Sequence, residues 1–181
     1  MAESSAKPHG DAPLSDARVG QDTTEKYLTF RLGAEEYGLE ILKVREIIGL
    51  MMITPVPRAP GDVRGVINLR GKIIPVVDLR RRFGMAAVEE NERNCIIVVD
   101  VASHGESVEI GVLVDEVSEV LDIPDGNIGP APQFGDRVST DFILGMAKVG
   151  DRVTILLKIE VVLVGVSQSL AELEPAMEAV A

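Results

Sequence analysis

Residues 64–84 read RGVINLRGKIIPVVDLRRRFG, and their pattern indicates one specific local structure. Two runs rich in Val, Ile and Leu, residues 65–69 and 72–79, meet at Arg70-Gly71. A glycine at such a junction supplies the positive φ that a tight turn between two strands needs. The stretch therefore predicts a β-hairpin with Arg70 at its tip.

Two residues restrict the second strand of this hairpin. Pro75 lies inside the run and has no N–H for a ladder hydrogen bond, so we expect the strand to lie at a sheet edge or to bulge there. Asp78 precedes residues 79–82 and Gly84 follows them, which predicts a short helical turn with an aspartate cap and a glycine stop. Strand, turn, proline-bearing strand and capped turn together form a long and specific signature.

The whole string resembles the CheW family of chemotaxis coupling proteins, and the similarity can be followed from about Lys26 to Leu163. The resemblance implies a mostly β fold, with two SH3-like, five-stranded β-barrels packed side by side around a shared apolar seam. Short helical turns and a C-terminal helix complete this fold. The positions that carry the structural motif are Gly65, Asn68, Gly71, Pro75 and Asp78.

The chain divides into three parts on composition and pattern. Residues 1–25 are rich in Ala, Ser, Asp, Gly and Pro, which predicts a disordered N-terminal tail. Residues 26–164 form the CheW-like domain, and we expect its two intertwined barrels to be linked near residues 85–93, a small acidic segment without pattern. Residues 165–181 are predicted to be a C-terminal tail that is partly helical.

Alternation of apolar and polar residues predicts the remaining strands. Between residues 40 and 48, however, Ile41, Val44 and Ile47 recur at every third position, which predicts a helical turn. The strands expected outside the central hairpin cover residues 27–32, 37–39, 95–101, 108–114, 117–123, 143–149 and 152–157.

Two internal similarities indicate a duplicated architecture. Residues 145–159 align without a gap on residues 65–79, and residues 111–120 align on residues 38–47. Polar and apolar positions largely agree in both alignments, although β-rich sequences also match by chance. A true repeat predicts two similar barrels built around two pseudo-equivalent hairpins.

Composition limits the class of partner. The 181 residues are 46% hydrophobic but only 3% aromatic, which favours an aliphatic, strand-rich core. The net charge of −11 argues against nonspecific binding to nucleic acid or to an anionic membrane surface. The single cysteine, Cys95, is expected to be a buried, inert thiol. Because we find no signal-like segment and no apolar run of about 18 residues, we expect a soluble, cytoplasmic protein without membrane insertion.

The sequence offers no convergent catalytic set. The two histidines, His9 and His104, have no Cys or carboxylate at metal-ligand spacing, and no phosphate loop, nucleophile elbow or dinucleotide fingerprint occurs. Acidic pairs such as Glu35-Glu36 are better interpreted as solvated edges. We therefore expect a protein that is not an enzyme, needs no metal or cofactor, and acts by binding other proteins.

Basic residues concentrate between residues 58 and 82, where seven of them and two acidic residues give a local charge of +5. They either solubilise an edge strand or form a recognition surface, and the sequence leaves both interpretations open. In the CheW family, the arginine of the Asn-Leu-Arg-Gly turn belongs to the surface that meets the chemoreceptor. The resemblance thus implies a receptor-binding surface of Arg70, its pairing partner Glu46, and the neighbouring Val44 and Val117.

The resemblance also implies a surface for the histidine kinase CheA. The loop from Pro130 through Gln133 to Phe134 is similar to the family loop that docks on the CheW-like regulatory domain of this kinase. Phe134 is either an interface anchor or a lid over the second core. Gly129 departs from the family pattern, which is charged there, and this puts a polar contact at that edge in doubt.

These features predict a non-catalytic adaptor that couples the cytoplasmic tip of methyl-accepting chemoreceptors to CheA. We expect it to be a monomer when free and to join membrane receptor arrays through its partners. One alternative is a regulatory CheW-like module of a CheA-type kinase or of a receiver-fused adaptor, which the absence of a phosphoacceptor-histidine bundle, an ATP site and an acidic receiver pocket disfavours. The other is a β-barrel that binds small ligands, for which the short loops give no cavity signal.

Overall fold

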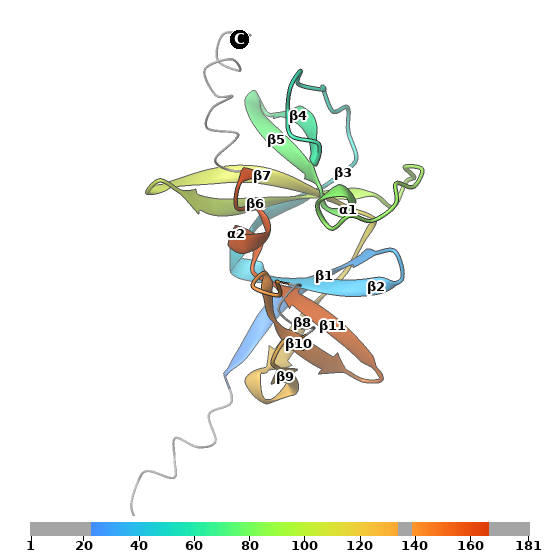
Figure 1. The fold of residues 1–181 in the computed structure, drawn as a ribbon, viewed down its shortest axis with the longest axis vertical. Helices are drawn as coiled ribbons and strands as arrows, with labels where there is room; N and C mark the ends of the chain where they lie inside the picture. Colours follow the sequence, from blue (N-terminus) through green and yellow to red (C-terminus); the bar gives the residue numbers. More distant parts are fainter. Residues whose placement is uncertain (1–22, 134–138, 167–181) are drawn as a thin grey trace, which may run out of the picture.

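The computed structural model describes residues 23–133 and 139–166. Its strands form two sheets that lie one above the other in Figure 1, and this confirms the mostly β fold. The six-stranded sheet has the order β8-β1-β2-β11-β10-β9, and the five-stranded sheet has the order β3-β6-β7-β5-β4. The α-helices α1 (Leu79–Arg82) and α2 (Ile159–Val162) are single turns. The strands are β1 (Thr24–Leu32), β2 (Glu35–Glu40), β3 (Val44–Gly49), β4 (Val63–Leu69), β5 (Lys72–Asp78), β6 (Cys95–Ser103), β7 (Glu106–Val114), β8 (Glu116–Pro124), β9 (Ile128–Gly129), β10 (Ile143–Val149) and β11 (Arg152–Leu157).

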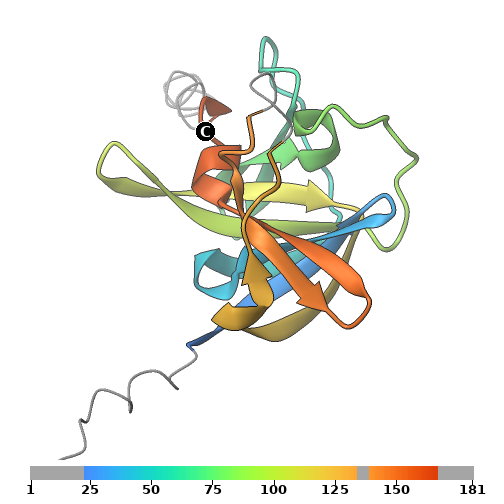
Figure 2. The ribbon, with the colours of Figure 1, turned by 60° about the horizontal axis from the view of Figure 1, so that its bottom comes forward.

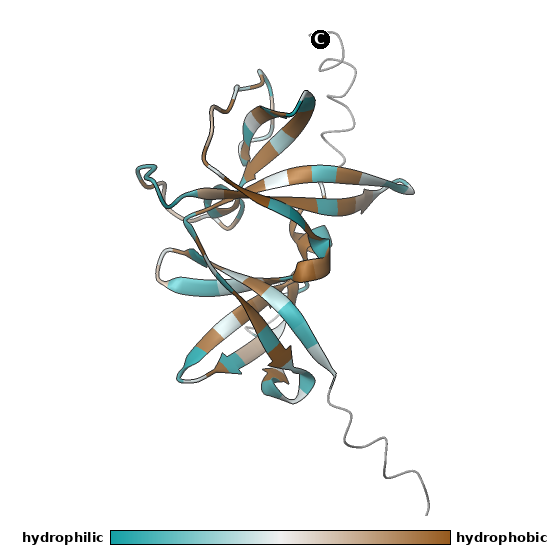
Figure 3. Cartoon of the chain, turned by 180° about the vertical axis from the view of Figure 1, so that it is seen from behind, coloured by the Kyte–Doolittle hydropathy of each residue, from teal (hydrophilic) through white to brown (hydrophobic). Residues whose placement is uncertain are grey.

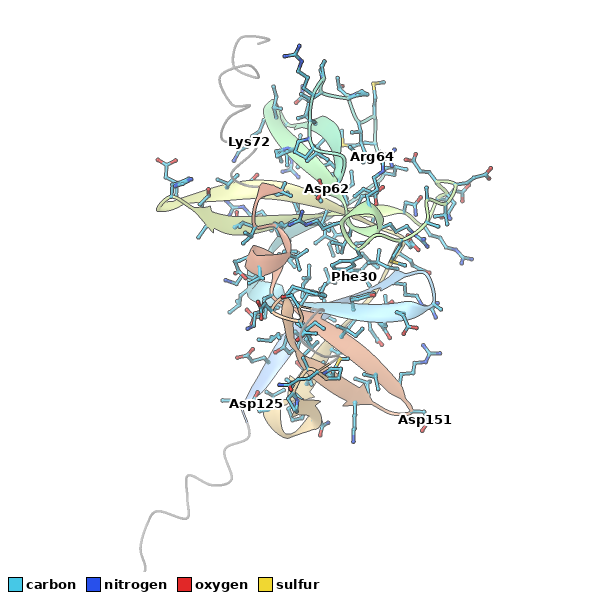
Figure 4. The ribbon with its side chains drawn as sticks, in the orientation of Figure 1. Phe30, Asp62, Arg64, Lys72, Asp125 and Asp151 are labelled. Atoms are coloured by element: carbon cyan, nitrogen blue, oxygen red, sulfur yellow. The ribbon has the colours of Figure 1, made fainter. Side chains whose placement is uncertain are left out.

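The two sheets share one apolar core, which we call the seam. It contains buried side chains from both sheets, including Phe30 of β1 and Val77 of β5. Figure 4 shows Phe30 between the two layers. Apolar segments, brown in Figure 3, recur along the strands of both sheets and alternate with hydrophilic positions. The predicted apolar seam between the two halves is therefore present, and most of the side chains that fill it are aliphatic.

Each sheet curls on itself. The edge strands of the five-stranded sheet are β3 and β4, yet Thr54, which follows β3, exchanges backbone hydrogen bonds of 2.8 and 2.9 Å with Val66 of β4. In the six-stranded sheet, brought forward in Figure 2, β8 continues through a 3-10 turn (Asp125–Asn127) into β9, which pairs with β10. The two expected barrels are therefore present, and one of them has a sixth, two-residue strand.

The central hairpin forms as predicted. Leu69 of β4 faces Lys72 of β5, and both turn residues have positive φ, 55° for Arg70 and 85° for Gly71. The Gly71 N–H donates a hydrogen bond of 2.8 Å to Asn68 Oδ1, which stabilises the turn. A turn with two residues of positive φ matches the twist of the flanking strands, and it holds Arg70 at the tip.

Gly65 is required by a close approach of two backbones. Its φ is 145°, and a Cβ there would lie 2.1 Å from the carbonyl oxygen of Thr54. β4 also bulges at this point, because Val63 faces Val77 whereas Gly65 faces Val76. The absence of a side chain thus lets the segment after β3 close the barrel.

Pro75 lies in a central strand, so the expected edge position or bulge at this residue is wrong. β5 pairs with β4 on one side and with β7 on the other, and the β7 pairing begins only at Val76. The residue opposite Pro75 is Val66, whose N–H and C=O both bond to Thr54 rather than to β5. The missing N–H of the proline therefore falls where no ladder bond is made.

Asp78 caps α1 as predicted. Its Oδ1 accepts hydrogen bonds from the backbone N–H groups of Arg80 (3.0 Å) and Arg81 (3.4 Å). At the other end, the N–H groups of Gly84 and Met85 donate to the carbonyl oxygens of Arg81 and Arg80, and Gly84 has a φ of 70°. This Schellman arrangement ends the helix after one turn.

The repeated sequences correspond to equivalent segments of the structure. The unit β10–β11–α2 repeats β4–β5–α1 80 residues later, including a bulge at Gly145. The parallel pairs agree as well, because Leu156 faces Gly38 in one sheet and Val76 faces Gly111 in the other. By the same alignments β3 is equivalent to β8, and each of them enters the sheet opposite to that of the preceding strand. The halves are therefore intertwined.

The helical turn predicted between residues 40 and 48 is present but is confined to a 3-10 turn (Ile41–Lys43), after which β3 pairs with β6, because pairing with a neighbouring strand outweighs a short periodic pattern. A second expectation, the link near residues 85–93, is wrong. Residues 85–93 do not link the barrels, since they join α1 to β6 and both β5 and β6 belong to the five-stranded sheet. The actual links are the passages from β2 to β3 and from β7 to β8, which we call the crossovers.

The predicted tails lie mostly outside the described residues. β1 begins at Thr24, inside the segment expected to be a tail, and Val166 is buried in the seam. The rest of the predicted C-terminal tail, residues 167–181, is not among the described residues. Within the described ranges, none of the helices has the length and hydropathy of a membrane span.

Candidate functional site

Arg70 and Glu46 form a bidentate ion pair. Arg70 Nη1 donates to Glu46 Oε1 at 3.0 Å, and Nη2 donates to Oε2 at 2.7 Å. The Arg70 side chain is 73% exposed and that of Glu46 26%. The hydrogen bonds to Glu46 raise the pKa of the Arg70 guanidinium above its ordinary value. Because Glu46 lies on β3 and Arg70 follows β4, the pair joins the two edge strands and fixes the direction of an exposed arginine.

Most other basic residues of the 58–82 segment are also engaged in ion pairs. Lys72, beside the tip, pairs with Glu109 of β7 at 3.2 Å. The remaining pairs are Arg64–Asp78, Arg64–Glu90, Arg80–Asp115, Arg81–Asp78 and Arg82–Asp62. The edge position of β4 agrees with a solubilising role for this charge. Arg70 differs from the other arginines in these pairs because its side chain is the most exposed.

Val44 and Val117 occupy equivalent places, each just after a crossover. Both are half-buried and pack against the seam. Val44 begins β3 and faces Val99, whereas Val117 lies in β8 and faces Phe30. The structure thus brings Arg70, Glu46 and Val44 to one sheet and places Val117 on the other.

Sequence reasoning missed several exposed apolar residues in β3 and on either side of it. Leu42, in the turn that precedes β3, is 91% exposed, and Met52, after β3, is 84% exposed. Ile47 of β3 is also exposed. The available signal was the Met51-Met52 pair, because adjacent methionines in a short extended segment are typical of adaptable binding surfaces.

The loop expected to meet the kinase follows β9. Pro130 and Gln133 are exposed, and Gly129 pairs with Met146 of β10. Phe134 lies outside the described residues, so its role stays a prediction. In Figure 1, β9, from which this loop starts, and the β4–β5 hairpin lie at opposite ends of the molecule.

Most of the charged side chains that line a cleft beside α1 form ion pairs. The cleft has a volume of about 360 Å³ and is lined in part by the ion pairs Arg64–Asp78 and Arg80–Asp115. In residues 23–133 and 139–166, no group of three or more His, Cys, Asp or Glu side chains is arranged to hold a metal ion. Cys95 is half-buried rather than buried, and its thiol donates to the Arg93 carbonyl at 3.3 Å.

Two intertwined barrels that carry an exposed, ion-paired arginine at a hairpin tip and an exposed loop after β9 have the features of a protein-binding module. Residues 26–166 match the CheW-like domain family, and the chain belongs to this family. The chemotaxis protein CheW of Klebsiella aerogenes is 39% identical over 142 residues, which cover 78% of this chain and 83% of the relative. CheW of Rhizobium meliloti is 39% identical over 133 residues, which cover 74% and 83%.

A solved structure agrees with these relatives. The crystal structure of the scaffolding protein TtCheW from Thermoanaerobacter tengcongensis matches with a TM-score of 0.68 and 37% identity, over 77% of this chain and 92% of that chain. Relatives named as chemotaxis proteins and a neighbour described as a scaffold assign this chain a scaffold or adaptor role in chemotaxis.

Proposed function

We propose that this chain is a non-catalytic cytoplasmic adaptor that binds the cytoplasmic tip of a methyl-accepting chemoreceptor and the regulatory domain of the kinase CheA. The observation that carries the proposal is the Arg70–Glu46 pair. Arg70 is 73% exposed, yet two hydrogen bonds fix its direction. A guanidinium has five N–H donors, so three remain for a partner. An arginine held in place loses less side-chain entropy on binding than a free one.

Two features support a bridge rather than a single interface. The exposed Leu42 and Met52 lie before and after β3, the strand of Val44 and Glu46, and apolar side chains that a partner can desolvate beside a charged anchor are the usual composition of an interface core. Pro130 and Gln133 are exposed and follow β9, which lies at the other end of the molecule from the β4–β5 hairpin. An adaptor needs two separate faces, and this arrangement supplies them.

The adaptor role is tested by sedimenting receptor-bearing membranes with CheA in the presence and absence of this chain. We expect the kinase in the pellet to increase with the amount of chain added and to saturate. Recovery of kinase that does not depend on the chain contradicts the proposal. The same assay with Phe134→Ser tests the kinase surface, because the variant should pellet with the receptor while recovering less kinase, at an unchanged melting temperature. A lower melting temperature together with loss of both interactions assigns Phe134 to the core instead.

A further inference from the structure

Each single-turn helix carries a charged side chain that bonds to a crossover. Arg80 is the second residue of α1, and Glu160, 80 residues later, is the second residue of α2. Arg80 Nε donates to Asp115 Oδ1 at 2.6 Å, and Asp115 lies between β7 and β8. Glu160 forms an ion pair with Lys43, which ends the turn between β2 and β3. Both halves of the molecule therefore use the same position to hold a crossover.

The contact at Asp115 joins three parts of the chain. Asp115 Oδ2 also accepts a hydrogen bond of 2.7 Å from the Gly33 N–H in the β1–β2 turn, and Arg80 Nη1 donates to the Ala86 carbonyl at 2.9 Å. The Arg80 and Asp115 side chains are only 14% and 22% exposed. Desolvation pushes the pKa of Asp115 up, but the bonds from Arg80 and Gly33 outweigh it and lower this pKa. The Asp115 carboxylate is thus held in its charged form although its side chain is largely buried.

The Lys43–Glu160 contact is more open, with side chains 39% and 36% exposed. Lys43 directly precedes Val44, and Asp115 precedes Val117 by two residues. Each ion pair therefore anchors the chain beside a candidate receptor-contact residue. The more buried pair at Asp115 is expected to hold its crossover more firmly, because water screens it less.

The two pairs have opposite polarity. In the first the helix supplies the cation and the crossover the anion, and in the second the helix supplies the anion and the crossover the cation. In a duplicated fold either helix could meet either crossover during folding. Opposite polarity makes the wrong meetings, Arg80 with Lys43 and Glu160 with Asp115, repulsive. This charge pattern favours the observed topology over its exchanged alternative.

We propose that Arg80–Asp115 and Lys43–Glu160 are positioning pairs that fix the two crossovers and thereby the places of Val117 and Val44 at the seam. The significance of these two valines rests on the proposed function, whereas the positioning itself is a property of the isolated chain.

Amide hydrogen exchange of the free protein tests the first pair. Arg80→Glu places two carboxylates together, so the amides of residues 115–117 should exchange roughly tenfold faster or more, through local opening. The swap Arg80→Glu with Asp115→Arg should restore their protection. It should not restore protection of the Gly33 amide, because an arginine at position 115 offers no acceptor. The Gly71 amide, bonded to Asn68 in the distant hairpin, is the internal control and should not change in any variant.

Unchanged exchange at residues 115–117 in Arg80→Glu, or a swap that stays as open as the single variant, overturns the proposal. If Arg80→Glu does not fold, Arg80→Gln takes its place. The amides of residues 115–117 should again exchange faster than in the wild type, and unchanged exchange overturns the proposal. The second pair is measured by the Val44 amide in Lys43→Glu and in the swap Lys43→Glu with Glu160→Lys, where a smaller, few-fold change is expected because the pair is more exposed. Since no receptor or kinase is present, failure here leaves the adaptor proposal intact, and failure of the adaptor proposal leaves this result intact.

Discussion

Replacing Thr154 by valine should stabilise the protein. Thr154 lies in β11 with 0% exposure, and its hydroxyl has no hydrogen-bond partner within residues 23–133 and 139–166. An unpaired buried hydroxyl costs about 1–3 kcal/mol relative to water. Valine has nearly the same shape without the polar atom. The equivalent residue of the other half, Ile74, is apolar and fully buried, so the fold accepts a β-branched aliphatic side chain at this position.

We expect Thr154→Val to raise the free energy of unfolding by about 1 kcal/mol, because only part of the desolvation term is recovered once packing adjusts. For a chain of this size, that corresponds to a melting temperature about 2–4 °C higher. The measurement is urea unfolding followed by circular dichroism, with a higher midpoint and an unchanged slope.

Thr29→Val is the matched control. Thr29 is also 0% exposed, but its hydroxyl donates to the Glu119 carbonyl at 2.8 Å and accepts from the Glu119 N–H at 3.2 Å. The same substitution there should destabilise by about 1–2 kcal/mol, because it leaves two backbone groups unpaired. If Thr154→Val destabilises as much as Thr29→Val, the Thr154 hydroxyl has a partner and the reasoning is refuted.

Two further predictions concern the backbone and the response to acid. Gly65→Ala should cost more than about 2 kcal/mol in thermal or urea unfolding, because the new Cβ meets the Thr54 carbonyl at a positive φ, whereas Gly49→Ala, with nothing within 4 Å, should stay within about 0.5 kcal/mol. Asp115 has a lowered pKa in the folded state, so the stability it contributes is present above its unfolded pKa of about 3.9 and is lost as the pH falls through the folded value. The unfolding free energies of the wild type and Asp115→Asn should therefore converge as the pH falls below the folded pKa of Asp115. A difference that stays constant with pH contradicts the stabilising role of the Asp115 carboxylate.

Local chemistry made much of the fold predictable. The Arg70-Gly71 turn, the Asp78 cap and the Gly84 stop were all correct, because each depends on residues within a few positions of one another. The error at Pro75 has a different origin, since a proline is tolerated in a central strand when its missing N–H faces a gap in the ladder. That gap depends on where β7 begins to pair, which no local pattern encodes.

The intertwined topology was the harder part. Residues 85–93 have the composition of a linker, but a linker inside one sheet and a linker between two sheets have the same sequence character. The true links were short: the 3-10 turn before Val44 and the single residue Asp115 between β7 and β8. The repeat nevertheless pointed to them, because the alignment of residues 111–120 on residues 38–47 spans both crossovers.

The candidate site was predictable only through the family resemblance. Nothing local relates Glu46 to Arg70, which are 24 residues apart on opposite edges of a sheet, yet the structure joins them by two hydrogen bonds. The exposure of Leu42 and the ion pairs at the crossovers were not foreseen, because they depend on which face of the closed barrel remains in water.

The affinity of Arg70→Glu for receptor-bearing membranes, measured beside its melting temperature, tests whether Arg70 belongs to the receptor surface. The pair with Glu46 is exposed to water, so the melt should be nearly unchanged. The reversed charge next to Glu46 should weaken receptor binding by more than about 30-fold, as at an interface hot spot, and leave kinase binding unchanged. Arg152→Glu, with the same charge change on the equivalent hairpin of the other sheet, should leave receptor affinity unchanged. Receptor affinity that survives Arg70→Glu, or a variant that unfolds, contradicts the assignment of Arg70 to the receptor surface.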